Sequence, residues 1–486
     1  MDSNRMELHQ LIYELFKRQI MFGVHHFEDT LPTMKEASEY FFVSVDTVRK
    51  AYLKLKQEGY ITLSTGVGAV VSVRYGNRAI RRNIQNFFAR RRTALFDLAH
   101  STFPLLSNAQ WVSLRYAGPE ILDEVEAFCT AKNTPSPYRR VQQFLLIYNS
   151  LGNDLLIRLI WQMLLFLQAP FLSYSQNRNY FNGAGPLRDM VQLCRKKDWK
   201  ALWNAIELFQ RQFISALRLF YNERIPKGGG EQVEFDWSIY KESSQICYSL
   251  GLKLLHEIRE DSILEGTYLS APTNIAEDNG VSLNTVRRTI SILNKLGATQ
   301  TINGVGTKVL SPLESVKNRN VTHPVIQNRL LTFAQCVQIL TLSCRACAQM
   351  TAVSLTKFGI NAWVNQLKKV KRSGQYEIMV HACMEFISKF SPYQALQKSY
   401  AQLLEQLFWG YPLRDMHGTR ESINAFYLPY LNGLINCLEQ NELLDFSLIL
   451  EQLMRKELEF TVNYLKDLGI PNVSAILVFD DEDITK

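Results

Sequence analysis

The sequence lacks the features that identify most enzymes, metal proteins and cofactor-binding proteins. Only eight of its 486 residues are histidine, and we find no paired metal ligands at a usable spacing. It also contains no nucleophile elbow and no phosphate-binding loop. We therefore expect neither an enzyme nor a bound metal or other cofactor.

Cysteine pairs and uninterrupted apolar runs are also scarce. The eight cysteines are scattered through apolar helical stretches, which is typical of reduced, buried thiols in a cytosolic protein. The lone CxxC, Cys344 with Cys347, indicates two core cysteines on one helix. Segments 155–172 and 330–347 are interrupted by Arg, Gln or Pro, so we interpret them as central bundle helices and not membrane spans. Residues 1–5 show no signal-peptide pattern, and we expect a cytoplasmic protein with no membrane partner.

The composition is that of a mildly basic globular protein with several domains. Apolar residues make up 47% of the chain and charged residues 21%. A length of 486 residues exceeds one ordinary domain and suggests three or four. The formal net charge of +8 is compatible with nucleic-acid binding but does not establish it.

The most informative stretch is 43–55, which we predict to be a helix with one apolar face. Ser44 precedes this helix and can cap its first turn. The residues at apolar helical spacing are Val48, Ala51, Tyr52 and Leu55, and those on other faces are Asp46, Thr47, Arg49, Lys50 and Lys54. Such a helix can bury one side and present hydroxyls and cations on the other, as a DNA recognition helix requires.

The flanking residues complete a winged helix-turn-helix pattern over residues 1–76. An amphipathic helix is expected at 8–20, and a second helix follows Thr33, which can cap it. After the recognition helix, 60–63 and 69–73 are predicted to be short strands. Gly66 and Gly68 between them suit a tight hairpin, the wing.

These residues resemble the GntR family of bacterial transcription regulators. The resemblance rests on Leu31-Pro32-Thr33, Val43-Ser44 with Thr47-Val48-Arg49, Leu55 with Gly59-Tyr60-Ile61, and Gly66-Val67-Gly68. It implies that the recognition helix and the wing contact DNA. By the same resemblance, Lys35 occupies a place usually held by a DNA-contacting Arg, and Thr47 and Arg49 match contact positions. Val45 departs from the family, which usually has a base-contacting Arg there, so the mode of base recognition stays open.

A basic stretch with two phenylalanines follows the wing. Its members are Arg74, Arg78, Arg81, Arg82, Arg90, Arg91 and Arg92, with Phe87 and Phe88 between them. The stretch can lie against phosphates that flank an operator, since each cation near the DNA backbone adds salt-dependent affinity. It can equally be a linker helix with a solvated basic face and a phenylalanine anchor. Both interpretations stay open at this point.

Residues 77–226 show helical periodicity throughout and predict an all-α domain. Its order resembles the effector and oligomerisation domain of the FadR-like branch of the family, mainly over 143–153. The metal-binding positions of that branch correspond to Arg140, Phe144, Leu187 and Phe209, which cannot bind such a metal at neutral pH. Arg139, Arg140 and Gln143 either line a pocket for an acidic or polar effector or form a solvated face, which we favour.

After a linker at 227–240, the predicted order of three helices and a hairpin occurs a second time. Thr285 follows Thr47 by 238 positions (285 − 47), and Gly304 follows Gly66 by the same number, which indicates an internal duplication. We therefore predict a second winged helix-turn-helix domain at 241–312, a second all-α domain at 313–470 and an acidic tail at 471–486. In this copy Leu283 again stands where the family usually has Arg.

The leading hypothesis is a mainly α, tandem transcription regulator that binds a double-stranded DNA operator and senses a small-molecule effector. The candidate DNA-binding residues are Thr33, Lys35, Ser44, Asp46, Thr47, Arg49, Lys50, Gly66, Gly68, Thr273, Ser282, Asn284, Thr285, Arg287, Arg288, Gly304 and Gly306. The chain can act as a monomeric pseudo-dimer or as a homodimer with four winged helices. The alternative function is a non-catalytic interaction scaffold whose winged helices no longer bind DNA.

Overall fold

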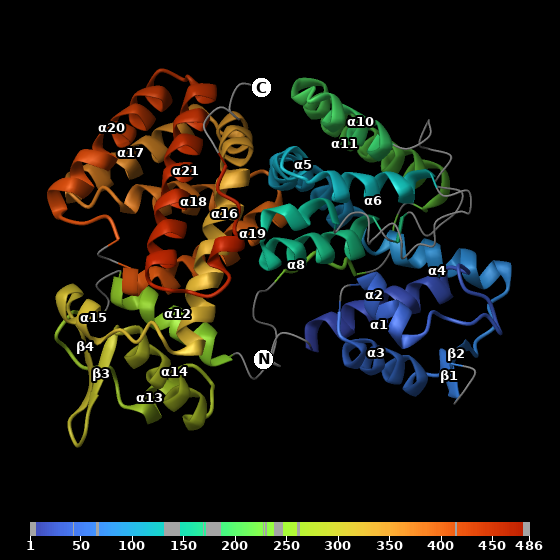
Figure 1. Ribbon diagram of the computed structural model, residues 1–486, viewed down its shortest axis with the longest axis horizontal. Coiled ribbons are helices and arrows are strands. Elements are labelled where there is room, and N and C mark those ends of the chain that lie inside the picture. The colour runs from blue at the N-terminus through green and yellow to red at the C-terminus, as the bar shows by residue number, and fades with distance from the viewer. Residues whose placement is uncertain are drawn as a thin grey trace. The chain divides into compact units, whose positions relative to one another are not determined.

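The computed structural model is mainly helical, and its strands form two small antiparallel hairpins (Figure 1). The structure describes residues 6–41, 43–64, 68–130, 146–168, 170–171, 186–226, 228, 231–237, 246–259, 263–413 and 416–479. The chain divides into two compact units, one of Met1–Leu151 with Leu156–Asp236 and one of Gly152–Leu155 with Trp237–Thr485. Each unit thus contains one of the predicted winged segments and the helical region that follows it.

The first unit begins with three helices and a hairpin, the winged helix-turn-helix that the sequence predicts. Its elements are α1 (Met6–Met21), α2 (Met34–Phe41), α3 (Val45–Gln57), β1 (Ile61–Ser64) and β2 (Gly68–Val71). The strands pair from Ile61 with Val71 to Ser64 with Gly68. Phe16 lies fully buried at the centre, with ring centroids 5.2 Å from Tyr52 and 6.0 Å from Phe41. This core joins all three helices because α1 and α3 each turn their apolar stripe toward it.

The rest of the first unit is helical in its described part. The elements are α4 (Asn77–Ala89), α5 (Arg92–Arg115), α6 (Pro119–Thr130), η1 (Asn149–Leu151), α8 (Asp154–Met163), the π-helical turn η2 (Leu164–Gln168), α10 (Pro186–Lys196) and α11 (Trp199–Arg224). Helix α11 packs along α5. The pocket residues suggested by the sequence, Arg139, Arg140 and Gln143, lie outside the described residues.

Within the expected linker at 227–240, residues 231–236 make contacts with the first unit. The N–H of Val233 donates to the carbonyl of Arg90 (2.6 Å), and the Gln232 amide donates to the carbonyl of Ala89 (3.1 Å). Phe235 is buried, with its ring 5.4 Å from that of Phe166. Residues 231–236 therefore belong to the first unit, since backbone hydrogen bonds and an aromatic anchor hold them there.

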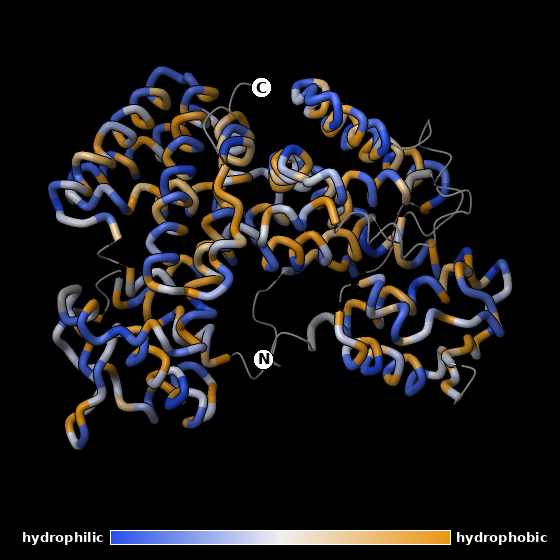
Figure 2. Tube along the Cα trace, in the orientation of Figure 1, coloured by the Kyte–Doolittle hydropathy of each residue, from blue (hydrophilic) through white to orange (hydrophobic). Residues whose placement is uncertain are grey.

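The second unit opens with the same order of elements. These are α12 (Ile246–Arg259), α13 (Pro272–Asp278), α14 (Leu283–Leu296), β3 (Thr299–Ile302) and β4 (Gly306–Val309). A helical bundle follows, with α15 (Pro312–Asn318), α16 (Pro324–Ser354), α17 (Lys357–Ser373), α18 (Ile378–Phe390), α19 (Gln394–Leu407), η5 (Phe408–Leu413), α20 (Arg420–Glu439), α21 (Leu443–Asp467) and η6 (Val473–Ala475). Hydrophobic and hydrophilic residues are interspersed along these helices (Figure 2).

Individual backbone contacts of the first winged segment recur in residues 268–309 of the second unit. The N–H of Leu31 donates to the carbonyl of Ala69 (2.9 Å), and the N–H of Leu269 donates to that of Thr307 (2.8 Å). Both residues of the second bond lie 238 positions after those of the first. The same shift relates β1 to β3, β2 to β4, the bridge Thr30–Val70 to Tyr268–Lys308, and the left-handed Gly59 to Gly297.

Helix α16 is the central helix of the second bundle. By length and composition it is one helix in the described residues that could cross a membrane, but 83% of its most apolar window is buried inside the protein. Such burial is typical of the core helix of a bundle, as the sequence predicts for residues 330–347. Cys344 and Cys347 are free, buried thiols on this helix, as predicted.

The acidic tail starts later than the expected residue 471. Val473, Ile476 and Phe479 are buried, and the side chain of Gln338 on α16 donates to the carbonyl of Leu477 (2.9 Å). Residues 471–479 therefore belong to the second bundle, because their apolar side chains lose water contact against it. Residues 480–486 lie outside the described part.

The left-handed glycines at the C-terminal ends of α3 and α14, Gly59 and Gly297, offer a matched test of packing. Gly59 (φ +79°) has open space where a Cβ would lie, whereas at Gly297 (φ +76°) a Cβ would stand 2.4 Å from the carbonyl oxygen of Ser315. We expect Gly59→Ala to destabilise its unit by about 1–2 kcal/mol through backbone strain alone. Gly297→Ala adds a backbone clash and should cost more than about 2 kcal/mol. Differential scanning calorimetry measures the stability of both variants. Equal losses of stability in the two variants would contradict the close packing around Gly297.

Candidate nucleic-acid interface

Helix α3 presents a charged surface around its first two turns. The side chains of Asp46, Arg49 and Lys50 are about half exposed. Asp46 pairs with Arg49 (3.7 Å) and with Lys50 (3.1 Å), so one carboxylate orients both cations. Val45, the first residue of the helix, is 41% exposed despite its aliphatic side chain. Cations and a short apolar group thus lie where a recognition helix meets DNA.

Thr47 does not belong to this exposed surface, contrary to the expectation from the family. It is only 1% exposed, and its hydroxyl lies 2.8 Å from that of Ser44. The N–H of Thr47 donates to the Ser44 hydroxyl (3.2 Å), which makes Ser44 the N-cap as predicted. The third position of the helix faces the core, so Thr47 supports the start of α3 instead of offering its side chain to DNA.

Helix α2 contributes a capping box and an exposed lysine. The Thr33 hydroxyl accepts from the N–H of Glu36 (3.2 Å), and the Glu36 carboxylate accepts from the N–H of Thr33 (2.8 Å). The hydrogen bond from the Thr33 backbone lowers the pKa of Glu36, with a smaller effect from the Thr33 hydroxyl. Thr33 therefore positions α2, while Lys35 in its first turn is exposed and available to a phosphate.

Only part of the first wing is described. Gly68 is exposed and takes a φ of +91°, a conformation that favours glycine. Ala69 and Val71 after it are buried and anchor the hairpin on the core. Gly66 lies outside the described residues, so its place in the wing stays a prediction.

The basic stretch after the wing contains the phenylalanine anchor that the sequence suggests. Phe88 on α4 is fully buried, with its ring 4.8 Å from Phe220 on α11. The Arg91 guanidinium lies 4.0 Å from the Phe87 ring centroid. The exposed members of the stretch are Arg74, Arg78, Arg81, Arg82 and Arg90. The anchor is confirmed, and contact of these arginines with phosphates remains a prediction.

The second predicted winged segment, from α12 to β4, also has exposed polar side chains. The exposed candidates are Thr273, Ser282, Asn284, Arg287, Arg288 and Gly304, and the half-buried ones are Thr285 and Gly306. Ser282 caps α14 by accepting from the N–H of Thr285 (3.1 Å). Gly304 and Gly306 both have positive φ, and the Tyr268 ring lies against the position of a Gly306 Cβ (3.2 Å). Leu283, the first residue of α14, is half-buried.

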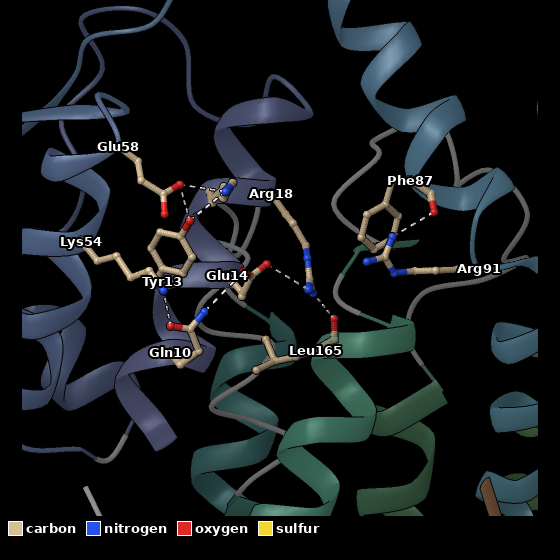
Figure 3. Close-up of polar contacts among 10 residues, drawn as sticks. Gln10, Tyr13, Glu14, Arg18, Lys54, Glu58, Phe87, Arg91 and Leu165 are labelled. Atoms are coloured by element: carbon tan, nitrogen blue, oxygen red, sulfur yellow. Dashed lines mark hydrogen bonds and ion pairs between the residues drawn. The ribbon is translucent and has the colours of Figure 1, made fainter. Parts of the chain in front are cut away.

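A contact that sequence reasoning missed fastens the first winged segment to the helical region of its own unit (Figure 3). The Arg18 guanidinium on α1 donates to the carbonyl of Leu165 in η2 (2.7 Å) and to the Glu14 carboxylate (3.2 Å). Burial lowers the pKa of Arg18, and Glu14 counteracts that effect. Trp161 on α8 packs its ring 5.5 Å from Phe41. These partners are far apart in the sequence and belong to no motif, so the sequence carries no signal for them.

Other side chains of α8 and η2 border a small cavity. Ile160, Met163, Leu164 and Leu167 line it, together with side chains of α5 and α11. Its volume of about 30 Å³ is enough for about one water molecule. Ser107 on α5 also lines the cavity, and its buried hydroxyl has no hydrogen-bond partner in the described structure. A polar group in this state favours a water or a small polar ligand.

No group of three His, Cys, Asp or Glu side chains in the described residues is arranged to hold a metal ion. The candidate residues in the described part of the chain thus offer hydroxyls, cations and apolar groups on α2 and α3 and on α13 and α14, with Gly68, Gly304 and Gly306 in the hairpins.

Comparisons with known proteins add an independent assignment for the first segment. Residues 8–71 match the family described as "Bacterial regulatory proteins, gntR family". Comparison with curated proteins gave no match.

Several solved structures are similar over nearly their whole length. Streptococcus agalactiae GntR is 17% identical, with 44% of this chain and 99% of that chain covered and a TM-score of 0.20. E. coli McbR/YncC is 19% identical, with 46% and 100% covered and a TM-score of 0.21. A putative transcriptional regulator GntR from Rhodococcus sp. RHA1 is 15% identical, with 46% and 98% covered and a TM-score of 0.26. At these TM-scores the likeness carries no structural argument, so the assignment rests on the family match. Residues 8–71 are a GntR-family winged helix-turn-helix domain, which supports a DNA-binding transcription regulator.

Proposed function

We propose that this chain is a transcription regulator that binds an operator through both winged segments and senses a small molecule through its helical regions. The observation that carries DNA binding is the exposed cationic surface of α3 inside the family-matched domain. The alternative, an interaction scaffold, is less well supported, because Arg49 and Lys50 keep exposed side chains at the position where a recognition helix contacts DNA.

The proposal that the two winged segments arose by duplication is supported by their common shift of 238 positions. The caps Ser44 and Ser282, the hairpin pairs and the left-handed glycines all follow this shift. Helix-turn-helix regulators place two recognition helices about one DNA turn apart. A single chain with two such helices can therefore act as a covalent pseudo-dimer, and its half-sites should be imperfect repeats because α3 and α14 differ.

The proposal of effector sensing is supported by the segment that joins cavity and winged domain. Residues of α8 and η2 line the cavity, and two others of these elements, Trp161 and Leu165, belong to the winged core. A π-helical turn often marks a functional position in a helix. A ligand that enlarges the cavity would displace η2 and, with it, the carbonyl held by Arg18.

The DNA-binding proposal is tested with DNA selected from a random pool by the wild-type chain. We expect Arg49→Ala to weaken binding of the selected DNA and to reduce the slope of log K against log salt by about one, because one phosphate or base contact is lost. Arg287→Ala should do the same if the second segment also binds. Fluorescence anisotropy at several salt concentrations measures both effects.

The matched control for these variants is Arg211→Ala, which removes an equally charged, exposed side chain from α11. It should leave the affinity and the salt slope unchanged. Absence of any binding at low salt, where phosphate contacts are strongest, would contradict the proposed function. If Arg49→Ala weakens DNA binding and Arg287→Ala does not, the chain would be a regulator whose second winged segment does not contact DNA.

A second prediction concerns the contact between α1 and η2. We expect Arg18→Met to lower the stability of the first unit by about 1–3 kcal/mol, because the Leu165 carbonyl and the Glu14 carboxylate lose a buried donor. Thermal unfolding followed by calorimetry measures the change. Arg211→Met, which breaks only the exposed pair with Glu207, should unfold at the wild-type temperature. Equal unfolding temperatures of Arg18→Met and Arg211→Met would show that Arg18 does not fasten the winged segment to η2.

A further inference from the structure

We infer that Val45 selects thymine in the operator by packing against the C5-methyl group in the major groove. This inference rests on the proposed DNA-binding function and specifies what part of the operator the first recognition helix contacts. It starts from an aliphatic side chain that is exposed at the first position of α3, beside the exposed charged side chains of Asp46 and Arg49.

The position of Val45 is set by the core beneath α3. Val48, Ala51, Tyr52 and Leu55 are each at most 1% exposed, so the rotation of the helix about its axis is fixed. That rotation turns Val45 outward at the first helical position, directly after the N-cap Ser44. The N-terminal residues of a recognition helix are those that contact base edges.

The neighbours of Val45 determine how the helix can approach DNA. Arg49 lies one turn further along the same face, and Asp46 holds both Arg49 and Lys50. The two cations therefore remain beside Val45 and can bind phosphates or a guanine edge next to the base that Val45 touches.

The chemistry of the valine side chain determines which base it favours in the major groove. Valine has no hydrogen-bond donor or acceptor, so it cannot distinguish bases by the polar groups of the major groove. The thymine methyl group is the apolar feature of that groove, and small apolar side chains contact it. An aliphatic group against any other base edge would bury a polar atom without a partner, which is unfavourable.

The test removes the methyl group without changing base pairing. Duplex DNA is first selected from a random pool by the full wild-type chain, and each thymine of the selected sequence is then replaced by uracil in turn. At one thymine position we expect uracil to weaken binding about fourfold, the loss expected for one buried methyl group. The Val45→Ala variant should bind the thymine and uracil duplexes equally at that position.

Leu53→Ala provides the matched control. Leu53 is also an exposed aliphatic residue of α3, at 50% exposure, but it lies two turns beyond Val45, away from the N-terminal turn. This variant should remain sensitive to uracil at the position to which Val45→Ala has become insensitive. Because both side chains are exposed, both variants should unfold at the wild-type temperature, and circular dichroism checks this.

The outcomes separate this inference from the function on which it rests. Selected DNA that binds with no sensitivity to uracil, or with equal sensitivity in wild type and Val45→Ala, overturns the role of Val45 and leaves the DNA-binding function standing. Failure to select or bind any DNA at low salt overturns both.

Discussion

Burial of one face of α3 is the constraint on which the rest of the first unit depends. Val48, Ala51, Tyr52 and Leu55 lose nearly all solvent contact against α1 and α2, with Phe16 at the centre. Burial of this kind contributes about 1.5–3 kcal/mol for each large side chain. Because it admits one rotation of the helix, it also decides that Val45, Asp46, Arg49 and Lys50 face outward while Thr47 faces inward.

The same core extends beyond the winged domain. Trp161 and Leu165 belong to it although they lie in the helical region, and Arg18 holds the backbone of η2 with a charge-assisted hydrogen bond. The exposed charged surface of α3 and the cavity lined by α8 and η2 therefore lie within a single compact unit. A change of shape at the cavity would reach α1 directly, because close-packed side chains transmit displacement.

The first winged segment and the segment from α12 to β4 share their local geometry and differ in the residues packed around it. Ser44 and Ser282 cap their helices in the same way, yet Gly297 is enclosed by the backbone near Ser315 while Gly59 is open. Helices α3 and α14 each begin with an aliphatic residue, Val45 or Leu283, but Val45 is exposed and Leu283 is half-buried. Positions related by the shift of 238 can thus differ in exposure, since the packing around each segment is its own.

The sequence by itself determined the features that depend on neighbouring residues. Capping at Ser44 and Ser282, the apolar stripe of α3 and the central helix α16 follow from spacing along the chain, because capping bonds and helical faces join residues a few positions apart. Only the tertiary structure decided that Thr47 is buried, that 231–236 and 471–479 pack against their units, and that Arg18 binds the Leu165 carbonyl. Those contacts join residues that are distant in the sequence, or depend on which face meets the core, and periodicity alone carries no information about the partner.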